Sequence, residues 1–132
     1  MKQADDRPVS PTTARRVLVV EDDQDSRELL IELIEYFGHY ALGCATPAEA
    51  LRIGQEAHLD FVLIDLGLGD ASGCDVARSL RALPHGASFR LVALTGYSDA
   101  ATRRLAAEAG FDDYVVKPFS AEALDALLGA QL

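Results

Sequence analysis

The sequence is poor in the residues that build disulfide frameworks and structural metal sites. Its 132 residues include two cysteines, one methionine and no tryptophan. Cys44 and Cys74 are far apart, stand in no CxxC motif and have no histidine pair nearby, so neither a zinc site nor a redox motif is indicated. We expect both to be small buried hydrophobic residues. A chain of this length can bury a core large enough to fold as one domain without cross-links.

Positive charge is also scarce. Twelve Lys and Arg residues stand against 21 Asp and Glu, which gives a net charge of −9. Residues 1–15 hold three bases and two acids, so residues 16–132 carry −10. A field of this sign repels phosphate backbones and anionic lipid, which argues against direct binding of nucleic acid or of a membrane surface. After Lys2 the sole lysine is Lys117, a scarcity that a bias towards arginine codons would also produce.

Long apolar runs are lacking as well. No stretch approaches the length of a transmembrane helix, and the first fifteen residues are polar and contain two prolines. We therefore predict a disordered N-terminal leader over residues 1–15 and a single folded domain over residues 16–132. Without a targeting segment, a cytoplasmic location is the default expectation.

From residue 16 onward, short apolar runs alternate with longer stretches of helical periodicity. Helix starts are marked by capping side chains at residues 23–26, by Thr46 with a proline after it, and by Ser120. Because parallel strands need crossover helices, five such units predict a doubly wound α/β domain with helices on both faces of a parallel sheet. The apolar runs predict strands at residues 17–20, 40–44, 61–64, 89–94 and 114–116.

Polar residues follow four of the predicted strands, at the edge where such sheets bind ligands. Several carboxylates beside one lysine suit a hard cation such as Mg2+ that is bound together with a phosphoryl group. Lysine, hydroxyl and backbone N–H donors could hold the phosphoryl oxygens, and a carboxylate could accept the group as an acyl phosphate. The residues are Glu21, Asp22 and Asp23 after the first strand, Asp65 after the third, Thr95 after the fourth and Lys117 after the fifth.

Each of these features has an ordinary structural explanation when it is taken alone. An acidic cluster after a strand is most often a solvated loop that caps a helix, and Asp65 or Thr95 before glycine could be a turn or cap residue. Lys117 before proline fits a chain turn with an exposed lysine. The order of acid pair, acid, hydroxyl and lysine along one sheet edge favours a binding site over a purely structural domain.

On these motifs the sequence resembles the receiver domain of two-component response regulators over residues 16–132. The resemblance implies a flavodoxin-like (βα)5 three-layer sandwich with sheet order 2-1-3-4-5, and a phosphoprotein of bacterial signal transduction. The similar segments are 17–23 (VLVVEDD), 60–66 (DFVLIDL) with Gly73 downstream, 94–96 (LTG) and 114–119 (YVVKPF).

The resemblance implies a metal-dependent phosphorylation site. Glu21 and Asp22 match the acid pair that binds Mg2+, and Glu21 stands where aspartate is commoner. Asp65 matches the phosphoryl acceptor, which also ligates the metal. Gly67 matches the position whose backbone carbonyl completes the ligand set.

The resemblance also implies a switch. Thr95 and Lys117 match the residues that contact the phosphoryl oxygens. Tyr114 matches the aromatic residue that turns inward when the threonine hydroxyl moves towards the phosphate. The surface around the fourth and fifth strands would then have two states.

The implied function is a signalling module rather than an enzyme with a separate substrate. Asp65 would receive its phosphoryl group from a phosphohistidine on a histidine kinase or a histidine phosphotransfer protein, and the altered surface would act on a downstream output protein or domain. A homodimer through the fourth helix, fifth strand and fifth helix is allowed. The length fits either a stand-alone receiver or the receiver of a longer response regulator or hybrid kinase.

Two alternatives belong to other classes. A phosphohydrolase of the haloacid-dehalogenase type also uses an aspartyl phosphate, but it has a second aspartate two positions after the nucleophile, where this chain has Gly67. A phosphate-independent interaction domain could keep the same fold, but such domains usually lose the acid pair, the acceptor or the lysine. All of these residues are present here.

Overall fold

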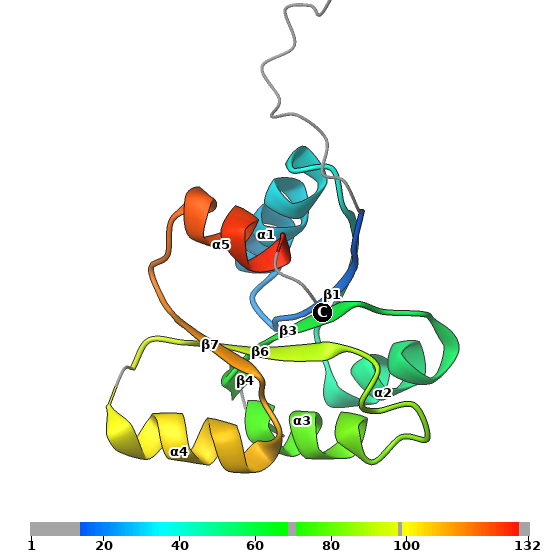
Figure 1. The fold of residues 1–132 in the computed structure, drawn as a ribbon, viewed down its shortest axis with the longest axis vertical. Coiled ribbons are helices and arrows are strands. Elements are labelled where there is room, and N and C mark those ends of the chain that lie inside the picture. The colour runs from blue at the N-terminus through cyan, green and yellow to red at the C-terminus, as the bar shows by residue number, and fades with distance from the viewer. Residues whose placement is uncertain (1–13, 69–70, 98, 130–132) are drawn as a thin grey trace, which may run out of the picture.

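A five-stranded parallel sheet forms the centre of the molecule (Figure 1). The computed structural model describes residues 14–68, 71–97 and 99–129. The spatial order β2-β1-β3-β6-β7 is the predicted order 2-1-3-4-5 when these strands are counted along the chain. The strands are β1 (Arg16–Val20), β2 (Tyr40–Cys44), β3 (Phe61–Asp65), β6 (Arg90–Thr95) and β7 (Asp113–Val116).

Helices cover both faces of this sheet, with α1 and α5 on one face and α2, α3 and α4 on the other (Figure 1). Asp23, Thr46 and Ser120 accept hydrogen bonds from the first turns of α1, α2 and α5. Thr46 and Ser120 were predicted as caps, and Asp23 lies in the predicted capping segment 23–26. Within the described ranges, no helix combines the length and apolar character needed to cross a bilayer. The helices are α1 (Gln24–Tyr36), α2 (Pro47–Glu56), α3 (Gly73–Arg81), α4 (Ala100–Ala109) and α5 (Ala121–Leu128).

The core has two halves because side chains alternate along each strand. In β1, Leu18 and Val20 pack with α2, α3 and α4, whereas Val17 and Val19 pack with α1 and α5. All four side chains are at most 1% exposed. Burial on both faces explains why the strands are uninterrupted apolar runs rather than alternating ones.

A second, very small sheet was not predicted. Strand β4 (Gly67–Leu68) pairs antiparallel with β5 (Ala71–Ser72) in the connection between β3 and α3. Two-residue strands are too short to show a period, so no sequence pattern indicates them. Just after this pair, Cys74 is only partly buried, which corrects the prediction of full burial, whereas Cys44 is buried as predicted.

Arg15, just before the predicted domain boundary, is hydrogen-bonded to the fold. Its backbone N–H donates to Nδ1 of His39 at 2.9 Å, and its carbonyl accepts from the Tyr40 N–H at 2.9 Å. Its Nε donates to the carbonyl of Leu128 at 3.1 Å. These bonds tie the entry of the chain to β2 and to the end of α5. Residues 1–13 of the predicted leader lie outside the described ranges.

His39 should make stability depend on pH. The residue is 5% exposed, and burial, followed by the charge of Arg15, lowers its pKa below the ordinary value, although Asp125 and Asp60 oppose this. At a pH between the lowered folded pKa and the unfolded pKa, His39 is therefore neutral in the folded state but protonated in the unfolded chain. We expect a stability contribution that is complete above about pH 6.5 and is lost as the pH falls through the lowered folded pKa, at up to about 1.4 kcal/mol per pH unit.

Urea unfolding between pH 7.5 and pH 5 measures this contribution. The His39→Asn variant keeps an acceptor near the position of Nδ1 but does not titrate, so its stability should fall less steeply over this range. His58→Gln is the matched control because the His58 side chain is 74% exposed. If the free energy of unfolding falls equally steeply with pH in the wild type and in His39→Asn, the prediction is contradicted.

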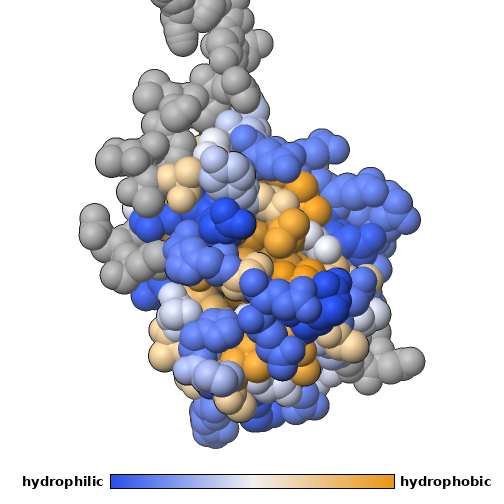
Figure 2. Space-filling view, turned by 90° about the vertical axis from the view of Figure 1, so that its right-hand side faces the viewer, coloured by the Kyte–Doolittle hydropathy of each residue, from blue (hydrophilic) through white to orange (hydrophobic). Residues whose placement is uncertain are grey.

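Strand β2 is an edge strand of the sheet and carries exposed apolar side chains. Tyr40 and Leu42 are 64% and 48% exposed, beside a groove of about 260 Å³ that Ala57 and Leu59 also line. Figure 2, which views the molecule from the right-hand side of Figure 1, shows apolar side chains gathered between polar ones. The guanidinium of Arg16 lies over the Tyr40 ring at 5.9 Å. This charge at the edge disfavours pairing with a strand of another chain.

Candidate functional site

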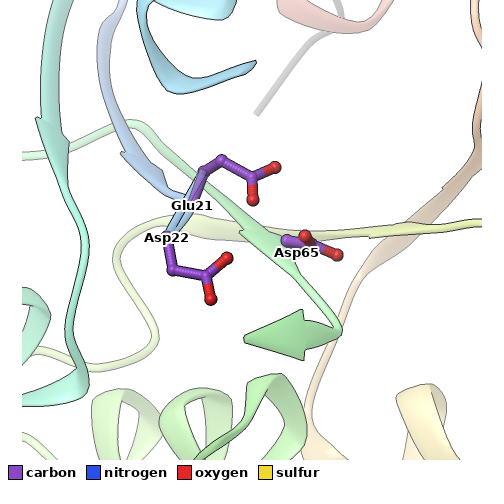
Figure 3. A group of neighbouring side chains, drawn as sticks. All are labelled: Glu21, Asp22 and Asp65. Carbon is purple, nitrogen blue, oxygen red and sulfur yellow. The ribbon is translucent and has the colours of Figure 1, made fainter. Parts of the chain in front are cut away.

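Three carboxylates meet where two neighbouring strands end. Glu21 and Asp22 directly follow β1, and Asp65 is the last residue of β3. The two strands pair in parallel, with Val20 opposite Ile64, so their carboxyl ends lie side by side. One carboxylate oxygen from each of the three residues lies within 4.8 Å of the other two (Figure 3). The structure thus brings together the three predicted side-chain ligands.

Asp23 does not join this group. Its Oδ2 accepts from the Ser26 N–H at 2.9 Å, which makes it the cap of α1. Its own N–H donates to Oε2 of Glu21 at 3.4 Å. Of the acidic run at the end of β1, two residues therefore face Asp65 and the third starts the helix.

Lys117 stands between two of the carboxylates. Its Nζ is 3.3 Å from Oε1 of Glu21 and 3.3 Å from Oδ2 of Asp65. Burial lowers the pKa of Lys117, but Asp65 and Glu21 outweigh burial and raise it above its ordinary value. Its backbone N–H donates to the Thr95 carbonyl at 2.6 Å, and the peptide bond to Pro118 is cis. The lysine is therefore charged, and its two ion pairs hold the ammonium between Glu21 and Asp65.

Glu21 is buried, with 2% of its surface exposed. Burial, followed by hydrogen bonding and repulsion from Asp65, raises the pKa of Glu21 above its ordinary value, while Lys117 acts in the opposite direction. With Asp22 the cluster has three acidic groups and one lysine, so it is short of positive charge.

The donor set fits Mg2+. All three side chains offer carboxylate oxygens, the ligands that this hard cation prefers, and the deficit of positive charge favours a divalent ion. Gly67, the remaining predicted ligand, lies close by, because its N–H donates to Oδ1 of Asp65 at 3.1 Å. That bond orients the Asp65 carboxylate. The role of the Gly67 carbonyl as a metal ligand stays a prediction.

Thr95 and Tyr114 are linked through the backbone of Tyr97. Oγ1 of Thr95, which is 3% exposed, accepts from the Tyr97 N–H at 3.1 Å. The Tyr114 hydroxyl donates to the Tyr97 carbonyl, and the guanidinium of Arg103 lies over the Tyr114 ring at 5.4 Å. The same residue thus bonds both predicted switch side chains, a link that the sequence alone does not reveal.

Two residues shape the site from outside it: sequence reasoning missed Arg27, and it noted Gly73 only as part of a similar segment, without a structural role. Arg27 of α1 donates from Nη1 to the backbone carbonyl of Glu21 at 2.9 Å. Gly73 allows α3 to start against the end of β3, since a Cβ there would lie 2.7 Å from the carbonyl oxygen of Asp65. The sequence does not indicate the bond from Arg27, because an arginine five positions after an acid pair can have many other roles on a helix.

The fold and the site define a doubly wound α/β domain with an acidic, lysine-paired pocket at the carboxyl ends of its strands. The family model for the response regulator receiver domain matches residues 17–129. The chain belongs to this family and is a receiver domain of the two-component signalling type.

Two curated relatives are longer proteins. The chain is 40% identical over 117 residues to the two-component response regulator PhoP of Pseudomonas aeruginosa, which covers 89% of this chain and 51% of that protein. It is 36% identical over 121 residues to the DNA-binding response regulator MtrA of Mycobacterium tuberculosis, covering 92% and 52%. The chain thus spans about half the length of these relatives.

Solved structures of receiver domains are also similar to this chain. A CheY-like receiver domain from Methylobacillus flagellatus has 32% identity and a TM-score of 0.76, with 88% of this chain and 97% of that one covered. The receiver domain of the sensor histidine kinase PA1611 from Pseudomonas aeruginosa has 26% identity and a TM-score of 0.80, with 88% and 95% covered, and was solved with a magnesium ion coordinated in its active-site cleft.

Proposed function

We propose that Asp65 accepts a phosphoryl group from a phosphohistidine on a histidine kinase or a histidine phosphotransfer protein. Glu21, Asp22, Asp65 and the Gly67 carbonyl would hold Mg2+, which would offset negative charge at the reacting groups. The observation that carries the proposal is the position of Lys117, whose ammonium lies 3.3 Å from both Asp65 and Glu21. A related receiver domain was solved with a magnesium ion coordinated in its active-site cleft, which supports a role for Mg2+ at this site.

In the proposed transfer, an oxygen of Asp65 attacks phosphorus while the P–N bond of the donor breaks. The electron pair of that bond returns to the imidazole nitrogen, and the product is an acyl phosphate. Lys117 would donate to one phosphoryl oxygen and Thr95 to another, so the protein contributes mainly position and charge. The module would catalyse only its own phosphorylation and dephosphorylation.

The donor protein would reach Asp65 across an apolar groove that shares a wall with the site. This groove of about 470 Å³ is lined by Glu21 and Lys117 together with Leu29, Leu33 and Phe119. Leu29 is 58% exposed on α1. A helical protein that presents its phosphohistidine among apolar side chains would bury these residues as the phosphorus approaches Asp65.

Phosphorylation would act on the surface through Tyr97. If the Thr95 hydroxyl turns to the phosphoryl group, the N–H of Tyr97 loses its acceptor, and the carbonyl of Tyr97 is the acceptor for Tyr114. The backbone of this loop would therefore move together with the tyrosine. The changed surface of α4, β7 and α5 would contact an output domain, an output protein or a second copy of the chain, in a cytoplasmic setting.

Phosphorylation with a small donor tests the proposal. The wild type incubated with acetyl phosphate and Mg2+ should gain the mass of one phosphoryl group, and omission of Mg2+ or the Asp65→Asn substitution should abolish this gain. Asp75→Asn is the matched control, because Asp75 is an exposed acid on α3 that pairs with Arg78. Lack of modification in a folded wild type would refute the proposal, and turnover of sugar phosphates would favour a phosphohydrolase.

A further inference from the structure

We propose that Arg27 is a positioning residue for the metal site and increases its affinity for Mg2+, although its own charge is positive. The inference rests on the proposed function, because it takes Glu21 and Asp22 as metal ligands. Arg27 touches neither carboxylate in the described contacts. Its role would be to fix the main chain from which both carboxylates project.

The backbone of Glu21 is held on both sides. Its N–H donates to the Cys44 carbonyl of β2 at 3.0 Å, and its carbonyl accepts from Nη1 of Arg27 at 2.9 Å. That carbonyl belongs to the peptide group that joins Glu21 to Asp22. The hydrogen bond from Arg27 therefore sets the plane of this peptide and, with it, the direction in which the Asp22 side chain leaves the backbone. Asp22 itself is exposed, so no burial holds it in place.

The Arg27 side chain is also fixed along its length. Its backbone N–H donates to the Asp23 carbonyl at 2.9 Å in the first turn of α1. Its Cγ and Cδ pass over Gly43 of β2, where a Cβ would lie 3.1 Å from each of them. An arginine packed along its methylene groups loses little further freedom when its guanidinium bonds the carbonyl.

The positive charge of Arg27 and its hydrogen bond to the backbone should change Mg2+ affinity in opposite directions, so a substitution can tell them apart. A guanidinium near the site repels a divalent cation, so its removal should tighten Mg2+ binding if charge alone matters. If Arg27 positions the ligands, its removal should weaken binding instead. Groups that hold metal ligands without touching the metal typically change metal affinity by about 10- to 100-fold when they are removed.

Magnesium titrations followed by calorimetry or by amide chemical shifts would measure the effect. We expect Arg27→Met, which keeps the methylene packing on Gly43, to raise the Mg2+ dissociation constant about tenfold. Arg27→Lys, whose ammonium can still donate, should recover most of the lost affinity. Arg52→Met is the matched control, since Arg52 is an exposed residue of α2 that pairs with Glu56, and it should leave Mg2+ binding unchanged or slightly tighter.

Urea unfolding of the same variants in EDTA shows whether Arg27 has only a structural role. In that case Arg27→Met would lower the free energy of unfolding in the absence of metal, but it would leave the Mg2+ dissociation constant unchanged. If Arg27→Met does not fold, Arg27→Gln replaces it in the comparison. Unchanged or tighter Mg2+ binding in the neutral variant, or no recovery in Arg27→Lys, would overturn the inference. No Mg2+ binding by the wild type would refute the proposed function itself and remove the basis of this inference.

Discussion

Replacing Lys117 with methionine is expected to lower the free energy of unfolding by about 1–3 kcal/mol at pH 7 without divalent cations. The substitution leaves Glu21 and Asp65, whose side chains are 2% and 15% exposed, without their shared cation. Loss of one partner of a fully buried pair typically costs about 3–5 kcal/mol. The expected value is smaller because the Lys117 side chain is 34% exposed and solvent screens part of the interaction.

The loss should depend on pH and on Mg2+ in defined directions. The pKa of Glu21 is already raised by burial and by Asp65, and removal of Lys117 raises it further. The folded variant then binds a proton more readily than the unfolded chain, so the loss should be largest at neutral pH and shrink as the pH falls through the raised pKa of Glu21. Mg2+ should restore stability at pH 7, because the ion supplies the missing positive charge.

Urea unfolding at pH 7 and pH 5, with EDTA or with Mg2+, would measure these effects. Lys117→Arg is the control for charge: it should stay close to the wild type in stability. Because a fixed guanidinium fork replaces a compact ammonium, the arginine variant should still uncouple phosphorylation from the switch. Equal stability of Lys117→Met and the wild type in EDTA would show that the ion pairs contribute nothing to the fold.

The fold was predictable because its main signals are local. Uninterrupted apolar runs mark strands that are buried on both faces, and Asp23, Thr46 and Ser120 mark helix starts by the hydrogen bonds that they accept. The site was predictable for a related reason. In a parallel sheet the residue after each buried strand reaches the same edge, so Glu21 and Asp65 are neighbours although 44 positions separate them.

Features that depend on one long side chain were not predictable. Arg81 is an example, because it donates to the carbonyls of Gly86, Phe89 and Gly110 at 2.7, 2.8 and 3.0 Å, and its guanidinium also bonds Asp112. These bonds join the end of α3 to the connections before β6 and β7. No periodicity encodes such contacts, since any exposed arginine on a helix has the same local sequence signal. The bond from Arg27 to the backbone next to Asp22 escaped prediction for the same reason.

Replacing Gly73 with alanine is expected to destabilise the protein by about 1–3 kcal/mol and to weaken phosphorylation of Asp65 as well. The added Cβ would lie 2.7 Å from the Asp65 carbonyl oxygen and 2.8 Å from Cα of Leu66. Both atoms belong to the backbone, so no side-chain rotation relieves the clash. The end of β3 must move away from α3, and the acceptor carboxylate moves with it.

Gly96→Ala is the matched control, because among the described residues, the two chain neighbours aside, no heavy atom would lie within 4 Å of a Cβ at this exposed position. Alanine should raise the free energy of unfolding there by about 0.4–1 kcal/mol, because it lowers only the conformational entropy of the unfolded chain. Urea unfolding compares the two variants, and mass spectrometry after incubation with acetyl phosphate compares their modification. If Gly73→Ala loses stability but is modified at the wild-type rate, then β3 and α3 separate without moving Asp65, and the helix start does not position the acceptor.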